Sequence, residues 1–258
     1  MNTKHTALIT GASAGLGAQF ARQLAARGHD LILVARRADR LEALAAELRT
    51  AHGIDCHALS ADLADPAAPQ ALFESVAALG LTVDYLVNNA GIAGPDLLED
   101  RDWSDQDAFF QLMMSSVAHL CHLFVPPMRE RGFGRVINVA SVAARLPRAD
   151  GCNYAASKAY VVALSESLAV TLKGTGVNVC ALCPGFTHTD FHETAGLQDM
   201  KNSLPKFFWY EADVVVADGI RAVEKGKTIC ISGRLYRWLD PIFQSVWTRR
   251  FITAPGRN

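Results

Sequence analysis

Short apolar segments alternate with longer amphipathic segments along most of the chain. Several short segments are apolar throughout, which is typical of strands covered on both faces, and the longer segments carry apolar residues at helical spacing. This alternation predicts an α/β fold with a parallel sheet, helices on both of its faces, and a ligand site at the carboxyl ends of the strands. The predicted strands are residues 7–10, 30–35, 55–59, 84–89, 135–140, 177–182 and 228–233, and the predicted helices are residues 15–27, 39–51, 67–79, about 102–131, 152–173 and 212–225.

Two segments break the alternation. Residues 186–210 form a long irregular stretch that is rich in aromatic residues, and a loop of this length in a compact domain usually has a function or is disordered. Residues 234–258 carry apolar residues at helix-like spacing, with Pro241 interrupting. We therefore expect one domain over residues 1–233, with 186–210 as a lid over a ligand, and then a C-terminal arm.

Composition and charge exclude several classes of protein. The chain has 258 residues, half of them hydrophobic and a fifth charged, which suits one domain with a full core. A formal net charge of −1 gives no electrostatic basis for binding nucleic acid. The first strand begins almost at the N-terminus, which leaves no room for a targeting peptide, and no uninterrupted apolar run reaches the length of a membrane span.

The cysteines are expected to be buried thiols. The six of them are scattered, mostly among apolar neighbours. Cys180 and Cys183 have C-x-x-C spacing, but a metal site would need a second pair of ligands, and none is visible at suitable spacing. We expect no metal, reduced thiols and a cytoplasmic protein.

A glycine-rich turn follows the first predicted strand. Gly11, Gly15 and Gly17 allow a tight turn and a close approach of backbone to a ligand, and the next helix offers its unpaired N–H groups and positive dipole end to a pyrophosphate. The spacing is G-x-x-x-G-x-G rather than the commoner G-x-G-x-x-G. The prediction of a dinucleotide site therefore depends on how the turn and the helix N-terminus would bind a pyrophosphate, and not on a match to the common motif. The alternative is a tight strand–helix turn that binds nothing.

The residues after the second predicted strand indicate which dinucleotide binds. A fold that prefers NAD places an acidic residue there, against the adenosine ribose, whereas this sequence has Ala35, Arg36 and Arg37. A guanidinium binds a 2′-phosphate through two hydrogen bonds. We therefore predict NADP(H), with Arg36 as the main contact and Arg37 as the second. The alternative is that both arginines are solvated residues of the next helix.

Polar and small residues end the next two strands. Asp62 would accept a hydrogen bond from the adenine amino group, or it would be a helix N-cap. In the run Asn88–Asn89–Ala90–Gly91, the small residues let backbone approach a flat ligand and the amides tie neighbouring strands. A plain turn at the strand end is the alternative.

Tyr154 and Lys158 are the candidate catalytic pair. They lie four residues apart, so they share one face of the predicted helix. A tyrosine has a reference pKa of about 10, and a nearby ammonium favours the phenolate, which makes it usable as an acid or base near neutral pH. Ser141 ends the fifth predicted strand, at the sheet edge of the glycine turn, where its hydroxyl would hold a substrate carbonyl. Such a tyrosine–lysine pair also occurs on many helices without a catalytic role.

Together these segments resemble the short-chain dehydrogenase/reductase family. TGASAGLG (10–17), NNAG (88–91), Ser141, Tyr154-A-A-S-Lys158 and Pro184-Gly185 occur in the family's order and at its spacing, over about residues 4–232. The resemblance implies a Rossmann-type, doubly wound sheet of about seven strands, and reversible hydride transfer between NAD(P)(H) and a carbonyl or alcohol. It also implies that Tyr154 is the general acid in reduction, that Ser141 polarises the carbonyl, and that Lys158 lowers the Tyr154 pKa and holds the nicotinamide ribose.

The resemblance also places the cofactor along the chain. Pro184, Gly185 and Thr189 match the family's P-G-x-x-x-T stretch, which contacts the nicotinamide carboxamide and the phosphates, and Thr187 is a further expected contact. The full set of expected cofactor contacts is Gly11, Ser13, Ala14, Gly15, Leu16, Gly17, Arg36, Arg37, Asp62, Leu63, Asn89, Ala90, Gly91, Tyr154, Lys158, Pro184, Gly185, Thr187 and Thr189.

One position departs from the family pattern. Counting back thirteen residues from Pro126 gives Met113, where the family usually has an asparagine that holds a water between Lys158 and solvent. A thioether donates no hydrogen bond. We expect the catalytic serine, tyrosine and lysine to suffice, with a slower or rerouted proton supply.

The expected substrate is a hydrophobic carbonyl or alcohol, such as an acyl chain, a steroid or an aryl ketone. Aromatic and leucine residues of the lid, with Leu146 after the catalytic serine, indicate a mostly apolar pocket. His188 and His192 either flank this pocket or are merely solvated, and the aromatic residues would alternatively dock the following helix onto the core. The lid residues concerned are Phe186, Phe191, Leu197, Leu204, Phe207, Phe208, Trp209 and Tyr210.

The C-terminal arm has five arginines and one aspartate, a net charge of about +4, beside two tryptophans. That composition suits a helix on an anionic membrane, and it suits equally an arm packed on a partner subunit, which we favour. The resemblance implies a homodimer or homotetramer through the helices at 102–131 and 152–173. Two other hypotheses stay open: a cofactor-binding regulatory protein with little turnover, and a membrane-associated lipid-carbonyl reductase.

Overall fold

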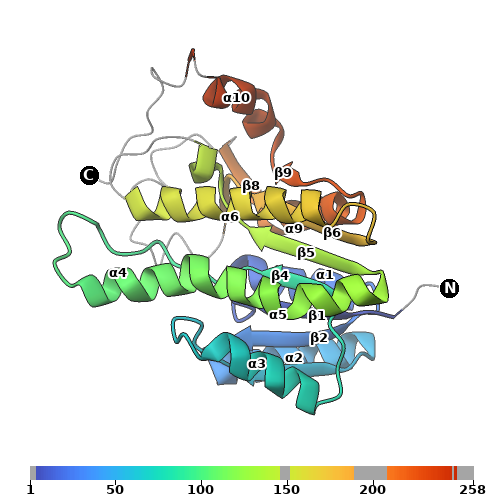
Figure 1. The fold of residues 1–258 in the computed structure, drawn as a ribbon. Helices are drawn as coiled ribbons and strands as arrows, with labels where there is room; N and C mark the ends of the chain where they lie inside the picture. Colours follow the sequence, from blue (N-terminus) through green and yellow to red (C-terminus); the bar gives the residue numbers. More distant parts are fainter. Residues whose placement is uncertain (1–3, 146–151, 189–207, 246, 249–258) are drawn as a thin grey trace.

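Seven of the apolar segments form the parallel strands of one sheet (Figure 1). The structure is a computed structural model that describes residues 4–145, 152–188, 208–245 and 247–248. The strand order β3-β2-β1-β4-β5-β6-β9, with every neighbouring pair parallel, confirms the predicted doubly wound sheet. The strands are β1 (Thr6–Thr10), β2 (Asp30–Ala35), β3 (Cys56–Ser60), β4 (Tyr85–Asn88), β5 (Gly134–Val139), β6 (Val177–Cys183) and β9 (Ile229–Ile231).

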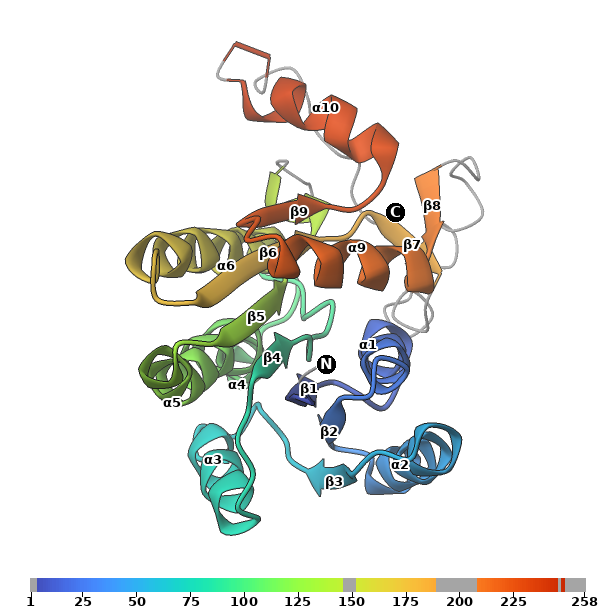
Figure 2. The ribbon, with the colours of Figure 1, turned by 90° about the vertical axis from the view of Figure 1, so that its right-hand side faces the viewer.

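Helices cover both faces of the sheet (Figure 2). Neighbouring side chains of β1 point to opposite faces, so Ile9 packs in one core cluster and Leu8 in another. Since the strands are apolar on both sides, each face needs its own layer of helices. Helices α1 (Gly15–Ala25), α2 (Ala38–His52) and α9 (Ala212–Glu224) lie on one face, and α3 (Ala68–Ala78), α5 (Ser116–Arg131) and α6 (Cys152–Thr171) lie on the other.

The predicted helix over 102–131 contains a π-helical turn. Helix α4 (Trp103–Phe110) continues through the π-helix η1 (Gln111–Ser115) into α5. By length and composition alone, the 29 residues Trp103–Arg131 would be able to cross a membrane, but 44 % of the apolar window is buried inside the protein, and serine and histidine residues interrupt the apolar run. One side of the helix packs in the core, where Phe124 and Met128 are buried.

The two ends of the lid segment form a small parallel sheet with each other. Strand β7 (Phe186–His188) is parallel to β8 (Trp209–Glu211), so the two ends of the predicted lid lie side by side. The predicted contact Thr189 and the candidate His192 lie outside the described residues, and so does Leu146. The same holds for the lid residues Phe191, Leu197, Leu204 and Phe207.

A last helix, α10 (Arg234–Gln244), follows β9 and lies outside the helical layers of the sheet (Figures 1 and 2). It runs through Pro241, so the predicted interruption at this proline is wrong. Gly233 precedes the helix with a φ of +95°, a value that favours glycine.

The cysteines are free thiols, and all but Cys152 are buried. Cys180 and Cys183 both lie in β6, and burial raises the pKa of the Cys183 thiol to about 12. The described residues include no cluster of three or more side chains suited to a metal ion. The interpretation of the C-x-x-C pair as buried thiols in a strand is confirmed.

Candidate active site

The glycine turn brings β1, α1 and the end of β4 into close contact. A Cβ on Gly17 would lie 2.2 Å from the Gly11 carbonyl oxygen, so only glycine lets α1 begin this close to the turn. The side chain of Asn89 donates to the Thr10 carbonyl oxygen at 2.9 Å, and the backbone N–H of Asn89 donates to the Thr10 hydroxyl at 2.9 Å. Ala14 is the N-cap of α1, and its side chain cannot cap the first-turn N–H groups. The turn therefore leaves helix donors available for an anion.

The predicted arginines lie beside this turn. Arg37 donates to the Ser13 hydroxyl from Nη2 at 2.9 Å and from Nε at 3.3 Å. Arg36 lies 3.9 Å from Asp62, and both side chains are at least half exposed. The N-cap of α3 is Ala67, so the alternative interpretation of Asp62 as a helix cap is wrong. Two exposed guanidinium groups therefore flank the end of the sheet where the adenosine half of a dinucleotide is expected.

Buried amides tie β4 and β5 to α6. The side chain of Asn88 donates to the Asn138 side-chain oxygen at 2.8 Å, and Asn138 in turn donates to the Ser165 hydroxyl at 2.9 Å. All three residues are buried, so these hydrogen bonds satisfy groups that cannot reach water. The predicted linking of neighbouring strands by these amides is confirmed.

Ser141, Tyr154 and Lys158 come from the segment after β5 and the first turns of α6. The Lys158 Nζ donates to the Val139 carbonyl oxygen at 2.8 Å and lies 5.8 Å from the centroid of the Tyr154 ring. Burial lowers the pKa of Lys158 to about 8. The Ser141 Oγ accepts from the N–H of Ala143 at 3.1 Å, which leaves its own proton to donate to a substrate oxygen. The structure thus brings together an ammonium and a phenol, with a hydroxyl on the adjoining strand end.

Met113 and Lys158 both lie beside Gly91, just after the end of β4. Its sulfur accepts from the N–H of Ile92 at 3.4 Å. A Cβ on Gly91 would lie 3.2 Å from this sulfur and 3.7 Å from the Lys158 Nζ. The departure from the family pattern therefore places an acceptor-only thioether, buried in a π-helical turn, close to the ammonium. Such π-turns frequently occur at functional sites.

The segment after β6 carries the predicted nicotinamide contacts. The Pro184 carbonyl oxygen accepts from the N–H of Val142 at 2.9 Å, and the Thr187 hydroxyl donates to the Gly185 carbonyl oxygen at 3.0 Å. A Cβ on Gly185 would lie 2.0 Å from the ring of Tyr236 in α10. The sequence gives no signal for Tyr236, because it lies in the arm, outside the catalytic and cofactor motifs and outside the apolar residues at helix-like spacing.

The described aromatic residues of the lid segment pack on one another and on α10. The rings of Phe186 and Trp209 are 5.3 Å apart, His188 stacks on Trp209 at 5.0 Å, and the rings of Tyr210 and Tyr236 are 6.0 Å apart. Trp209 is buried. These contacts involve α10 rather than α9, the helix that directly follows the segment, so both interpretations of the lid aromatics stay predictions.

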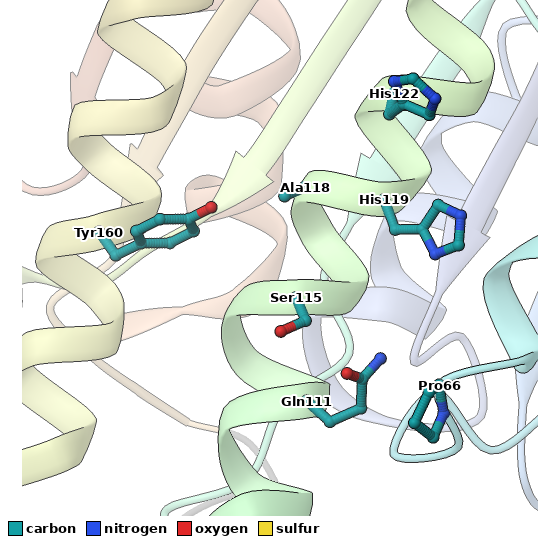
Figure 3. A pocket seen from close by; sticks show the side chains of 7 residues that line it. All are labelled: Pro66, Gln111, Ser115, Ala118, His119, His122 and Tyr160. Carbon is teal, nitrogen blue, oxygen red and sulfur yellow. The ribbon is translucent and has the colours of Figure 1, made fainter.

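A surface hollow of about 520 Å³ lies between α5, α6 and the loop after β3. In Figure 3, Tyr160 points from α6 toward α5, and His119 and His122 project from α5. The catalytic candidates are not among its lining residues, so it is a separate feature. Those residues are Pro66, Gln111, Ser115, Ala118, His119, His122 and Tyr160.

Comparison with known proteins agrees with the geometry. A family model described as short chain dehydrogenase matches residues 5–199. The chain belongs to the short-chain dehydrogenase/reductase family. A short-chain dehydrogenase/reductase is an oxidoreductase that acts on a carbonyl or an alcohol, which is what the resemblance implied.

Relatives of this short-chain dehydrogenase/reductase are similar over most of their length. It is 36 % identical over 201 residues to sulfoacetaldehyde reductase 2 of Chromohalobacter salexigens, a match that covers 76 % of this chain and 79 % of the relative. It is 30 % identical over 249 residues to the 3-oxoacyl-(acyl-carrier-protein) reductase FabG of Staphylococcus aureus, covering 92 % of this chain and all of the relative. A short-chain dehydrogenase from Sphingobium yanoikuyae, solved in complex with NADPH, has a TM-score of 0.81 and 33 % identity over 91 % of each chain.

Proposed function

We propose that this protein is an NADP(H)-dependent reductase of a hydrophobic ketone or aldehyde, and that it also catalyses the reverse oxidation. The observation that carries the proposal is the buried ammonium of Lys158, 5.8 Å from the centroid of the Tyr154 ring. Burying a charged group costs free energy, so its retention beside a phenol that belongs to the family motif suits general acid–base catalysis.

The chain's own residues account for the proton transfers. In reduction, Tyr154 donates its phenolic proton to the carbonyl oxygen of the substrate, while Ser141 donates a hydrogen bond to the same oxygen. The ammonium of Lys158 favours the phenolate that remains. In oxidation, the phenolate accepts the proton of the alcohol.

The residues of the glycine turn fit a dinucleotide. The close packing of Gly17 on Gly11 and the uncapped start of α1 at Ala14 make a cradle for phosphates. When bound, NADP(H) supplies or accepts the hydride. We assign its adenine to Asp62 and Leu63, its nicotinamide ribose to Lys158, and its nicotinamide to the ends of β4 and β6 at Asn89, Ala90, Gly91, Pro184, Gly185 and Thr187.

We assign the 2′-phosphate to Arg36, with Arg37 as the second contact. Both side chains are exposed beside the turn. Ala35 occupies the position where an NAD-preferring fold has an acidic residue, so no carboxylate at that position repels a phosphate. That the Sphingobium yanoikuyae relative was solved with NADPH supports NADP(H) as the cofactor. Arg36→Ala should weaken NADPH binding about 10- to 100-fold, because hydrogen bonds to charged groups contribute about 1.5–3 kcal/mol each. A wild-type preference for NADH that Arg36→Ala leaves unchanged would refute it.

The substrate class is inferred from the apolar character of the lid segment. One relative is a sulfoacetaldehyde reductase and the other a 3-oxoacyl reductase, so the two relatives do not agree on a substrate. The test is a panel of acyl, steroid and aryl carbonyls with NADPH, run for wild type and Tyr154→Phe. Removing the general acid should lower turnover by about 10²- to 10⁴-fold while NADPH binding is retained. Tight NADPH binding without Tyr154-dependent turnover on any substrate would favour a cofactor-binding regulatory protein.

We further propose a homodimer or homotetramer through α5 and α6. These helices border the surface hollow, and they present Tyr160, 36 % exposed, and Val170, 77 % exposed. A charge placed in an apolar interface is unfavourable. Val170→Glu should therefore shift the mass measured by light scattering toward the monomer. Leu79→Glu, at an exposed leucine after α3, is the control and should leave the mass unchanged. An equal mass for both variants would refute this interface.

We place the outer face of the arm on a partner subunit. Trp238 and Trp247 are 81 % and 78 % exposed, and Ile242 of α10 is 46 % exposed. Trp238→Ser should then weaken self-association in sedimentation experiments. Flotation of the wild type with anionic vesicles, lost in Trp238→Ser, would instead support the membrane-associated enzyme.

A further inference from the structure

We propose that helix α10 is a positioning element of the active site, with Asp240 and Tyr236 as the residues through which it acts. The helix fixes two loops that meet at the carboxyl ends of β5 and β6. One loop carries Ser141 and the other carries Pro184 and Gly185. Neither positioning residue belongs to the motifs of the sequence, and neither is assigned to substrate or cofactor.

The first anchor is an ion pair between Asp240 and Arg145. The guanidinium donates from Nε at 2.5 Å and from Nη2 at 2.6 Å to the two carboxylate oxygens, which is the fork geometry of a strong arginine–carboxylate pair. Both side chains are more than four-fifths buried, so water screens the pair less than it screens a surface pair. Gln244 adds a hydrogen bond from its side chain to the Arg145 carbonyl oxygen at 2.8 Å.

One short 3₁₀-helix connects Arg145 to Ser141, so the ion pair also restricts the position of Ser141. The 3₁₀-helix Val142–Arg145 begins at the residue after the catalytic serine and ends at Arg145. Within it, the Ser141 carbonyl oxygen accepts from the N–H of Ala144 at 3.1 Å, and Ser141 Oγ accepts from the N–H of Ala143 at 3.1 Å. Holding the far end of this single turn therefore fixes the direction in which the Ser141 hydroxyl points.

The second anchor is the ring of Tyr236 on Gly185. A Cβ at Gly185 would lie 2.0 Å from this ring, so the ring fills the space that a side chain would take. The Tyr236 hydroxyl accepts from the N–H of Phe186 at 3.4 Å and donates to the Phe208 carbonyl oxygen at 3.0 Å. One buried hydroxyl thus holds both the segment after β6 and the residue that precedes β8.

The two anchors act on loops that are already joined, because the Val142 N–H donates to the Pro184 carbonyl oxygen at 2.9 Å. In Figures 1 and 2, α10 lies beyond β9, apart from the helices that cover the sheet. The inner side of α10 therefore contacts the two loops rather than the helices that cover the sheet. The consequence is that loosening α10 should change the geometry of the carbonyl site more than the affinity for the dinucleotide.

The test is Asp240→Asn, with Glu47→Gln as the matched control. Glu47 pairs with Arg22 through two hydrogen bonds of the same fork type, but on the exposed surface between α1 and α2. Asp240→Asn should lower kcat/KM for the carbonyl about 10- to 100-fold, which is the effect of a small misplacement of reacting groups. NADPH affinity should change little, the thermal midpoint should fall because Arg145 loses its buried carboxylate partner, and Glu47→Gln should behave as wild type. The kinetic arm of this test rests on the proposed function.

A second readout does not depend on turnover. Hydrogen exchange of the Ala143 and Ala144 amides should be faster in Asp240→Asn than in wild type, and unchanged in Glu47→Gln. Reversing the pair in the double variant Arg145→Glu with Asp240→Arg should recover part of the protection. A wild type inactive on every carbonyl would count against the proposed function alone, since the exchange measurement would still report the anchor. Equal exchange and equal kcat/KM in Asp240→Asn and wild type would overturn the inference.

Discussion

The cofactor side and the substrate side of this active site are built in different ways. On the cofactor side, the contacts are made to backbone within one short turn: the backbone of Gly17 packs on the Gly11 carbonyl, and the Asn89 side chain donates to the Thr10 carbonyl oxygen. On the substrate side, where the loops after β5 and β6 also reach the assigned nicotinamide position, the strand ends are held by side chains of a C-terminal helix, through the Arg145–Asp240 pair and the Tyr236 ring.

This difference suggests how one fold keeps a dinucleotide site while the substrates vary, as they do between the sulfoacetaldehyde and 3-oxoacyl reductases to which the chain is similar. Backbone contacts within a short motif leave few acceptable substitutions, because a Cβ or a shifted carbonyl has nowhere to go. Contacts made by side chains of a distant helix change with a single substitution and leave the sheet intact. The two sides should therefore differ in how they respond to the same perturbation, which is a methyl group added at a glycine.

Gly17→Ala should have the largest effect. Its Cβ would lie 2.2 Å from a backbone oxygen and 2.6 Å from the Asn89 amide, and backbone cannot move aside. We expect a loss of about 3 kcal/mol in the free energy of unfolding, typical of overpacking, and no measurable NADPH binding. Denaturant unfolding and fluorescence titration with NADPH provide the measurements.

Gly28→Ala is the matched control for that variant. Gly28 has a φ of +81° but open space around its Cα, so only the backbone strain remains. Its cost should be near 1 kcal/mol, with NADPH affinity retained. If Gly17→Ala bound NADPH as Gly28→Ala does, the rigid description of the cofactor side would be wrong.

Gly185→Ala should have a smaller effect that a second substitution relieves. Its Cβ would lie 2.0 Å from the Tyr236 ring, and a ring on a single helix is able to move where a strand is not. We expect a loss in kcat/KM of about 10- to 100-fold, and NADPH binding that is weakened but still measurable, because Gly185 is one of several assigned nicotinamide contacts. Adding Tyr236→Ala should recover part of the loss, so the two changes should not be additive in a double-mutant cycle. Strict additivity would contradict the contact as the cause.

The difference between local motifs on the cofactor side and long-range side-chain contacts on the substrate side also explains which features could be predicted from the sequence. The sheet, the glycine turn and the Tyr154–Lys158 spacing are local patterns, and local patterns can be recognised without knowing the fold. The Asp240–Arg145 pair joins residues far apart in the chain, and neither looks different from a solvated charge before folding brings them together. The π-helical turn around Met113 was likewise missed, since its residues are as apolar as those of an ordinary helix. Pro241 was expected to interrupt the helical pattern of the arm, but α10 contains it.

The pH dependence of reduction should come from Lys158, which lies where the cofactor side and the substrate side of the active site meet. Burial lowers its pKa to about 8, so the ammonium is present below that pH and is lost as the pH rises through it. At saturating NADPH, kcat/KM should therefore fall above about pH 8, by roughly tenfold per pH unit if the ammonium is required. Lys158→Arg should be slower overall but should keep its charge, which removes this fall. A wild-type profile that stays flat to pH 10 would show that the ammonium is dispensable.

The same group has a linked effect on stability. The unfolded chain binds this proton with the ordinary lysine pKa of 10.5, above the folded value. Burial of the charge therefore destabilises the apoprotein at all pH values below about 8, and the penalty disappears between about pH 8 and 10.5. Lys158→Met should be more stable than wild type at pH 7, and the difference should shrink toward pH 10 in denaturant titrations.

Met113 should give the smallest effect, because it acts beside the reacting groups rather than on them. Met113→Leu keeps the size but removes the sulfur that accepts from the Ile92 N–H, so it should cost about 1 kcal/mol of stability and leave the pH profile unchanged. Met113→Asn restores an amide that both accepts from Ile92 and donates toward the region of Lys158. If proton supply to Lys158 limits turnover, Met113→Asn should raise kcat by up to about tenfold and change its solvent isotope effect, since proton transfer would no longer be limiting. If neither kcat nor its pH dependence differs from the Met113→Leu control, the thioether does not restrict the proton path, and its role is to hold the end of β4 against the π-turn.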